Sequence, residues 1–119
     1  MRHPERLQDY LEHILEAAQN VLVYTDGYQL DDFIGDTRTQ QAVILNLIII
    51  GEAATKIMDK YQPFTIIHHE IAWHGMRGMR NRIAHGYFDI NLTVVWETIQ
   101  SALPKLILQI SPLLSETKL

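Results

Sequence analysis

The eight residues RNRIAHGY, in a chain of 119, hold three side chains suited to chemistry: Arg80, His85 and Tyr87. Arg80 carries a planar guanidinium that fits phosphate oxygens and stays charged at physiological pH. A histidine such as His85 takes up and releases protons near neutral pH. These are the two functions needed to cleave RNA without a metal. A base takes the proton of the ribose 2′-hydroxyl, which attacks the adjacent phosphorus, and a cation stabilises the charge that develops.

The same residues also fit the ordinary end of a helix. Basic side chains are favourable near the last carbonyl groups, and Gly86 suits the left-handed cap. Arg80 and His85 are five residues apart, so on a straight helix they point about 140° away from each other. A shared site therefore requires either that the helix unwinds before His85 or that two chains each supply one group.

Charge is unevenly distributed along the chain. The net charge of −4 argues against non-specific wrapping of nucleic acid. The segment 68–87, however, contains three arginines, four histidines and a single acid, whereas the first 36 residues contain eight acids. This locally basic segment favours a few specific phosphate contacts. Arg77 and Arg82 are assigned to such contacts on charge alone.

Metal and cysteine chemistry are not expected. The stretch HHEIAWH (68–74) is rich in histidine, but His69 and His74 are five residues apart, whereas two helical ligands of one metal lie four apart. Histidines that are solvated or cap a helix are the favoured interpretation, and no cofactor is indicated. The chain has no cysteine, which excludes disulfides and thiolate metal sites and suits a reducing cytoplasm.

Glu52 is an acid in the otherwise apolar stretch IIGEAA. A buried carboxylate needs a partner. Glu52 is therefore a structural salt-bridge residue or an exposed one, or else it orients an arginine or histidine of the site. Asn81, beside Arg80, is a second candidate for an orienting role.

The spacing of apolar residues predicts an all-α, up-and-down four-helix bundle in a single domain, residues 1–119. Helices are expected at about 4–26, 37–61, 66–85 and 92–114, with one helical turn in the loop YQLDDFIGD. Pro4 suits the first turn of the first helix, and Asp36 suits the N-cap of the second. Gly86 ends the third, and Pro104 is expected to kink the fourth.

The second predicted helix is apolar nearly all round between residues 42 and 50. Such a helix is either the central core helix of the bundle or has a homodimer interface on its outer face. The run of nine residues is short of the roughly 20 needed to cross a bilayer. The N-terminal sequence does not fit a signal peptide either. We therefore expect a cytoplasmic protein with no membrane partner.

The sequence resembles HEPN-domain toxins of the HepT type. Residues 80–87 match the family signature R-x4-H-x-Y. TQQAVILNLIIIGEAATK, AWHGMRGMRNRIAHGYFDIN and VWETIQSALPKL resemble the segments around it, over most of the chain. The resemblance implies an all-helical homodimer that acts as a metal-independent endoribonuclease, with a composite site at the dimer cleft. Arg80 and His85 would be catalytic. Tyr87 would be adenylylated by a cognate minimal nucleotidyltransferase antitoxin (MntA-like), which blocks RNA.

Two other interpretations stay open at this point. The chain could be a non-catalytic helical partner subunit that binds a nucleotidyltransferase or a nucleotide through the same cleft. Alternatively, RNRIAHGY could be no more than a helix end in a dimeric bundle. The first predicts binding to that partner without RNA turnover. The second predicts that no ligand with a phosphate group binds.

Overall fold

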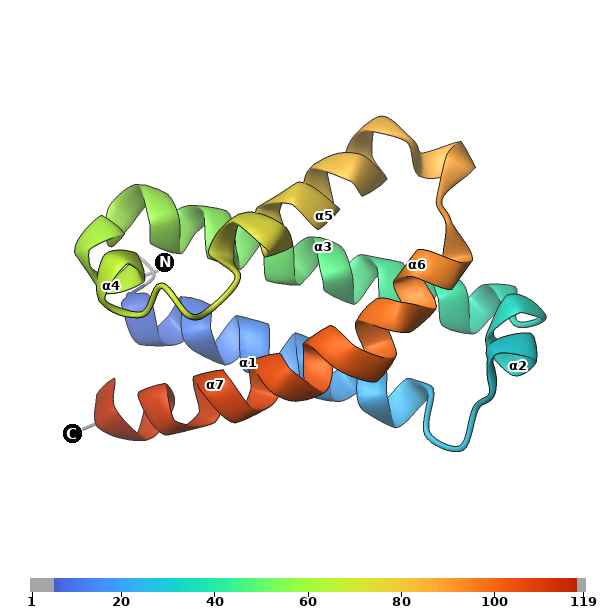
Figure 1. Cartoon of the computed structure of the whole chain (residues 1–119), viewed down its shortest axis with the longest axis horizontal. Coiled ribbons are helices and arrows are strands. Elements are labelled where there is room, and N and C mark those ends of the chain that lie inside the picture. The colour runs from blue at the N-terminus through green and yellow to red at the C-terminus, as the bar shows by residue number, and fades with distance from the viewer. Residues whose placement is uncertain (1–5, 118–119) are drawn as a thin grey trace, which may run out of the picture.

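The computed structural model describes residues 6–117 and, over that range, is all-helical, as predicted (Figure 1). Its longer helices run antiparallel in chain order: α1 (Leu7–Tyr24), α3 (Thr37–Lys60), α5 (Trp73–His85) and α7 (Leu103–Thr117). Shorter helices connect them: α2 (Leu30–Ile34), α4 (Gln62–Ile67) and α6 (Leu92–Glu97). The predicted role of Pro4 falls outside the described residues.

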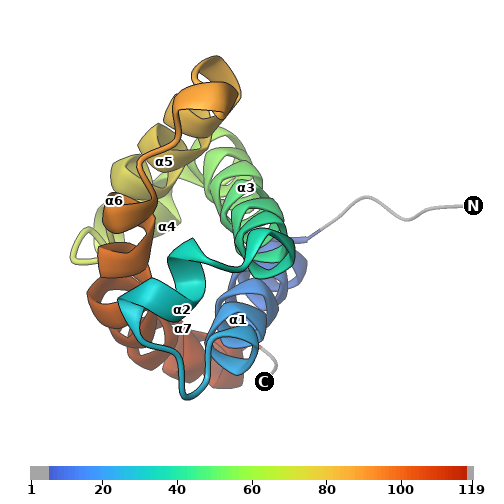
Figure 2. The same ribbon diagram turned by 90° about the vertical axis from the view of Figure 1, so that its right-hand side faces the viewer.

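The core lies among the long helices. α1 packs between α3 and α7, and α3 packs against α5 on its other side (Figure 2). Apolar side chains from all these helices meet there with almost no exposure. The most buried large ones are Leu11, Ile14, Val21, Phe33, Val43, Ile57, Ile71, Val95, Ile99 and Ile110. Burial on this scale is what holds a helical domain of this size together.

α3 begins where the sequence predicted. The Asp36 carboxylate accepts a hydrogen bond from the Thr39 backbone N–H at 3.1 Å, so Asp36 is the N-cap. The Thr39 and Tyr28 hydroxyls also donate to this carboxylate, each at 2.6 Å. The cap therefore ties the start of α3 to the loop before α2.

The outer face of α3 exposes two large apolar side chains among polar and charged ones. Leu47 and Ile50 are buried, whereas Leu45 and Ile49 are exposed on the other side of the helix. In the part of the chain that the structure describes, α3 is the single helix long and apolar enough to cross a membrane, by length and composition only. Half of its apolar window is buried inside the bundle, as in a core helix. One chain alone therefore covers one face of α3 and leaves the other bare.

The predicted third helix is two helices, and its start at Ile66 is corrected to Trp73. Pro63 lies in the first turn of α4, where its missing N–H is no loss, so it starts a short helix as well as ending α3. Residues 68–72 are not helical, and the Trp73 indole N–H donates to the His68 carbonyl at 3.0 Å across this turn. The comparison of the five-residue spacing between His69 and His74 with that of ligands on one helix therefore does not apply, because His69 lies outside α5.

The predicted fourth helix contains a widened turn before its proline. Residues 98–102 form one π-helical turn between α6 and α7, in which the Leu103 N–H bonds to the Thr98 carbonyl five residues back. Pro104, the second residue of α7, has no N–H to donate. The wide turn absorbs this loss, so the chain continues as a helix past Pro104.

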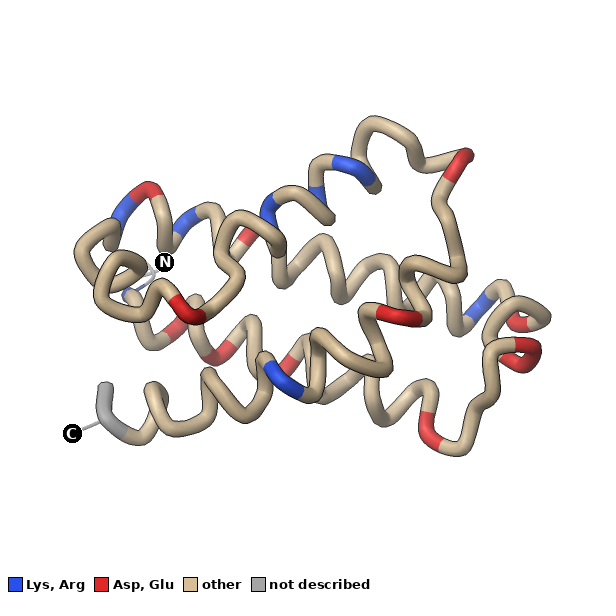
Figure 3. Tube along the Cα trace, in the orientation of Figure 1, with Lys and Arg blue, Asp and Glu red and all other residues tan. Residues whose placement is uncertain are grey.

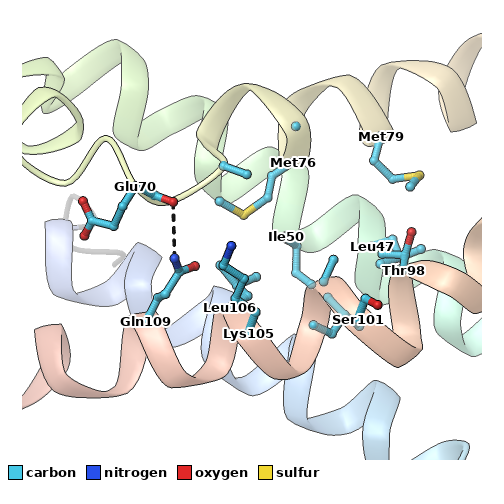
Figure 4. A pocket seen from close by; sticks show the side chains of 14 residues that line it. Leu47, Ile50, Glu70, Met76, Met79, Thr98, Ser101, Lys105, Leu106 and Gln109 are labelled. Carbon is cyan, nitrogen blue, oxygen red and sulfur yellow. Dashed lines mark hydrogen bonds between the residues drawn. The ribbon is translucent and has the colours of Figure 1, made fainter.

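α5 lies against α3 and, unlike α1, does not run along α7. Its C-terminal end and the turn that follows project from the body of the molecule (Figures 1 and 2). A cavity of about 430 Å³ lies between α5 and α7, and its lining is mostly apolar (Figure 4). The Gln109 side chain donates to the Glu70 carbonyl oxygen at 3.2 Å across it. None of the candidate site residues lines this cavity.

Candidate active site

Gly51 is the point where α3 and α5 come closest around the candidate site. A Cβ at this position would overlap the Cβ of Arg80 and lie 2.8 Å from the Met76 carbonyl oxygen. Real Cβ atoms essentially never come that close to backbone, so residue 51 has to be glycine for the two helices to cross here. The crossing places Arg80 directly beside the next residue of α3, Glu52.

Arg80 is held in place by two side chains. Its Nη1 donates to Glu52 Oε1 at 2.6 Å, and its Nε donates to Asn81 Oδ1 at 2.9 Å. The Arg80 side chain is 21% exposed and that of Glu52 is 52% exposed. Two bonds to different nitrogens fix the plane of the guanidinium, and Nη2 makes no bond to a described residue. The group is thus oriented, with donors left for an anion.

His85 lies on the same helix as Arg80 and faces a different direction. α5 remains helical through His85, and the Gly86 N–H donates to the Arg82 carbonyl at 3.0 Å. The helix therefore does not unwind before His85, and one of the two arrangements considered from the sequence is absent. His85 is exposed, and its side chain makes no hydrogen bond to any described residue. Within one chain, the fixed cation and the free imidazole point about 140° apart.

Tyr87 and Phe88 follow Gly86 in a short 3-10 turn, η1 (Tyr87–Asp89). Tyr87 is 52% exposed, so its hydroxyl is accessible to a modifying enzyme, and Phe88 is 97% exposed. The two rings meet edge to face, with centroids 5.8 Å apart. From the sequence, Phe88 was assigned no role. It could have been noticed as an aromatic residue that directly follows the motif and fits no apolar helical face.

Arg77 and Arg82 lie on different sides of α5. Arg77 is about 60° around the helix from Arg80, and its Nη2 lies 3.1 Å from His74 Nδ1. Arg82 is about 160° from Arg80, and its Nη2 donates to the Met79 sulfur at 4.0 Å. Positive charge therefore gathers along α5 (Figure 3), but only Arg77 lies beside Arg80. The two assignments made on charge alone are not equivalent.

The histidine-rich stretch sits at the start of α5, away from Arg80. His68 packs on the Phe64 ring, with centroids 4.5 Å apart, and its Nδ1 lies 3.6 Å from Glu70 Oε1. No group of three or more His, Cys, Asp or Glu side chains that could hold a metal occurs within residues 6–117. The polar groups that converge on one point are those of Glu52, Arg80 and Asn81.

Over residues 14–113 the chain matches a family model described as ribonuclease HepT-like. It is 38% identical to a Thermococcus cleftensis protein named probable ribonuclease HepT. The aligned region of 99 residues covers 83% of this chain and 87% of the relative. It is 32% identical to a Caldanaerobacter subterraneus subsp. tengcongensis protein that is named as a candidate RNase. The aligned region of 109 residues covers 92% of this chain and 95% of that relative. A Methanocaldococcus jannaschii protein, also named as a candidate RNase, is 30% identical to the chain. The aligned region of 107 residues covers 90% of this chain and 86% of that relative. No solved structure matches the chain significantly.

Proposed function

The chain belongs to the HepT-like ribonuclease family, and from that premise we propose that it is a metal-independent endoribonuclease, the toxin of a toxin–antitoxin system. The observation that carries the proposal is the Arg80 guanidinium, fixed by Glu52 and Asn81, on the helix that also presents an unbonded His85. A cation that is oriented before substrate arrives stabilises charge in a transition state without the cost of reorganisation.

The reaction follows from these two groups. His85 takes the proton of a ribose 2′-hydroxyl, and the 2′-oxygen forms a bond to the adjacent phosphorus. Arg80 donates hydrogen bonds to the phosphate oxygens as negative charge builds up on them. The bond from phosphorus to the 5′-oxygen of the next nucleotide then breaks, and that oxygen takes up a proton. The products are a 2′,3′-cyclic phosphate and a 5′-hydroxyl end.

We infer that two chains complete the site, because Arg80 and His85 diverge within one. Leu45, Ile49 and Glu52 lie at steps of four and three, so they share one face of α3. Pairing this exposed face across a two-fold axis would bury Leu45 and Ile49. The same pairing would bring the Arg80 sites of both chains near the axis, where the partner's His85 can meet Arg80.

Tyr87 is the proposed point of control. A cognate minimal nucleotidyltransferase antitoxin would transfer AMP to its hydroxyl, which stands two residues from His85 at the exposed end of α5. A bulky anionic group there would repel the RNA backbone and block the cleft, as phosphorylation does elsewhere. We place the system in the cytoplasm, where both RNA and the antitoxin are found.

The direct test of this proposal is RNA cleavage in EDTA by protein prepared without the antitoxin. Wild type should cut RNA and leave 2′,3′-cyclic phosphate ends, and it should not cut at a position that carries a 2′-deoxyribose. Arg80→Ala and His85→Ala should each reduce cleavage at least about a hundredfold, with unchanged sedimentation. Wild-type rates in both variants would sink the assignment. Binding of a nucleotidyltransferase without any RNA turnover would instead support the non-catalytic partner subunit.

A further inference from the structure

Phe88 is the most exposed large apolar side chain in the part of the chain that the structure describes. It is 97% exposed, while Leu108 and Val23 follow at 76% and 72%. The chain buries its other phenylalanines, Phe33 fully and Phe64 partly. An aromatic ring left wholly in water is unfavourable on its own, and a ligand that covered the ring would remove it from water.

The backbone that carries the Phe88 ring forms a hydrogen-bonded turn. Gly86 ends α5, and the Asp89 N–H donates to the Gly86 carbonyl at 2.9 Å, which closes the turn. The Tyr87 ring then meets the Phe88 ring at 90°, an edge-to-face contact favoured between aromatic rings. The turn therefore holds the backbone of Phe88 on the projecting end of α5, while its ring lies against the Tyr87 ring and is otherwise exposed. Ordering the backbone before a ligand binds lowers the entropy cost of binding.

The segment that leads to Phe88 carries several exposed cations besides the exposed Tyr87 ring. Arg82 and His85 are exposed just before it in the sequence, and Arg77 and Arg80 lie one to two helical turns further back. Asp89 is the one acid in the turn itself. A protein partner would be expected to meet a continuous apolar patch. An exposed aromatic ring on the same segment as several cations is instead the combination with which proteins bind single-stranded RNA.

We propose that Phe88 is a nucleobase-stacking site that holds the base of a nucleotide flanking the cleaved bond. This rests on the proposed ribonuclease function and narrows its substrate class. Stacking needs an unpaired base, so the RNA is cut in a single-stranded region such as a loop or an end. Stacking accepts every base, so Phe88 contributes affinity and position rather than sequence preference.

The test compares variants that separate the aromatic face from apolar bulk. Phe88→Leu keeps a large apolar side chain but removes the aromatic ring, whereas Phe88→Trp keeps an aromatic ring. Leu108→Ala removes an exposed apolar side chain on α7 and is the matched control. The probe is a fluorescent single-stranded RNA of about 12 nucleotides with 2′-O-methyl riboses, which can bind but cannot be cut. Binding is measured by anisotropy, folding by thermal melts, and oligomeric state by sedimentation.

We expect Phe88→Leu to bind this RNA about tenfold more weakly, while Phe88→Trp and Leu108→Ala bind like wild type. In a series of RNAs that each carry one abasic site at a different position, one RNA should bind wild type about tenfold more weakly than the intact RNA does. The same abasic site should leave the affinity of Phe88→Leu unchanged, because that variant has already lost the stacking contact. On unmodified RNA, kcat/KM for Phe88→Leu should fall by a similar factor.

Three outcomes separate this inference from the proposed function. If wild type cleaves RNA, His85→Ala does not, and Phe88→Leu behaves as wild type, stacking is overturned and the ribonuclease stands. If Phe88→Leu changes the sedimentation of the protein and Leu108→Ala does not, Phe88 is a contact between proteins and stacking is again overturned. If binding depends on Phe88 but wild type never cleaves, Phe88 stacks on a base of bound RNA, while the ribonuclease function and the position beside a cleaved bond are both overturned.

Discussion

At the scale of single residues, the central contact joins positions 28 apart in the chain. Glu52 accepts a hydrogen bond from Arg80 Nη1 at 2.6 Å, and Asn81 accepts one from Arg80 Nε at 2.9 Å. From the sequence alone, Glu52 had several possible roles, and one of them was to orient an arginine or histidine that could not be specified. Its partner could not be chosen from the sequence, because the pairing depends on where α3 and α5 cross.

Replacing Glu52 tests whether this contact serves catalysis or stability. Glu52→Gln keeps an acceptor but removes the charge that holds Arg80, so kcat should fall between about ten- and a hundredfold. Glu52 is half exposed and Arg80 is partly exposed, so the Tm should change by no more than a few degrees. Glu97→Gln, at an exposed glutamate on α6, is the control and should leave kcat unchanged. A large loss of Tm with unchanged kcat would assign the pair to structure instead.

Phe88 shows what residue-level reading of the sequence misses. Its neighbours Arg80, His85 and Tyr87 were recognised by chemical type and by a family signature. A phenylalanine carries no such signature, and a single apolar residue in a turn is ordinarily a core residue. Only the exposure of Phe88, at 97%, distinguishes it from a core residue.

At the scale of elements, the site depends on how closely α5 approaches α3. Gly51→Ala would put a methyl group onto the Arg80 Cβ and close to the Met76 carbonyl, so the helices would have to part. We expect a loss of about 1–3 kcal/mol in unfolding free energy together with a lower kcat. Urea unfolding and steady-state cleavage measure the two effects.

Gly75→Ala is the matched control for that substitution. Gly75 is also helical, but a Cβ there would meet only the Ala72 Cβ, at an ordinary 3.4 Å. Alanine is favoured over glycine in a helix by about 1 kcal/mol, so this variant should be as stable as wild type or more so. Equal effects of the two substitutions would show that the close crossing at Gly51 is not what positions Arg80.

The cap of α3 gives a prediction about pH. Hydrogen bonds from the Thr39 side chain, the Tyr28 hydroxyl and the Thr39 backbone lower the pKa of Asp36 from 3.8 to about 2. The folded state thus favours the ionised carboxylate, whose stabilising effect is complete above pH 3.8 and is lost as the pH falls through about 2. Asp36→Asn should lower the Tm by a few degrees at neutral pH, and thermal melts should show this gap closing near pH 2. A gap that stays constant with pH would contradict this role for the carboxylate.

The sequence predicted some of these elements better than others. The N-cap of α3, the helical turn at α2 and the end of α5 at Gly86 depend on local chemistry that is visible in the residues themselves. The left-handed cap expected at Gly86 is wrong, because Gly86 has φ −131° and ψ 42° and ends α5 without that conformation. The break at 68–72 was missed because Pro63 indicates where a helix breaks but not that a separate short helix starts there, and because apolar residues such as Ala72 and Met76 follow at helical spacing. The wide turn before Pro104 was predicted only as a kink. Its form depends on how α6 and α7 pack on the core.

At the scale of the whole molecule, a single chain leaves two things incomplete. The outer face of α3 exposes Leu45 and Ile49, and the two proposed catalytic groups point in different directions from α5. One pairing of chains would resolve both, since Leu45 and Ile49 share their helix face with Glu52, the partner of Arg80. The sequence predicted the angular mismatch between Arg80 and His85. That α5 stays helical through His85 had to come from the structure.

The most direct measurement mixes two inactive variants. Arg80→Ala and His85→Ala are each purified, unfolded, mixed in equal amounts and refolded together, and RNA cleavage is measured in EDTA. If Arg80 of one chain acts with His85 of the other, random pairing leaves one intact site in half of the dimers, so about a quarter of the wild-type activity should return. If the mixture stays as inactive as either variant alone, although exchange of subunits is demonstrated by mass, the shared site is contradicted.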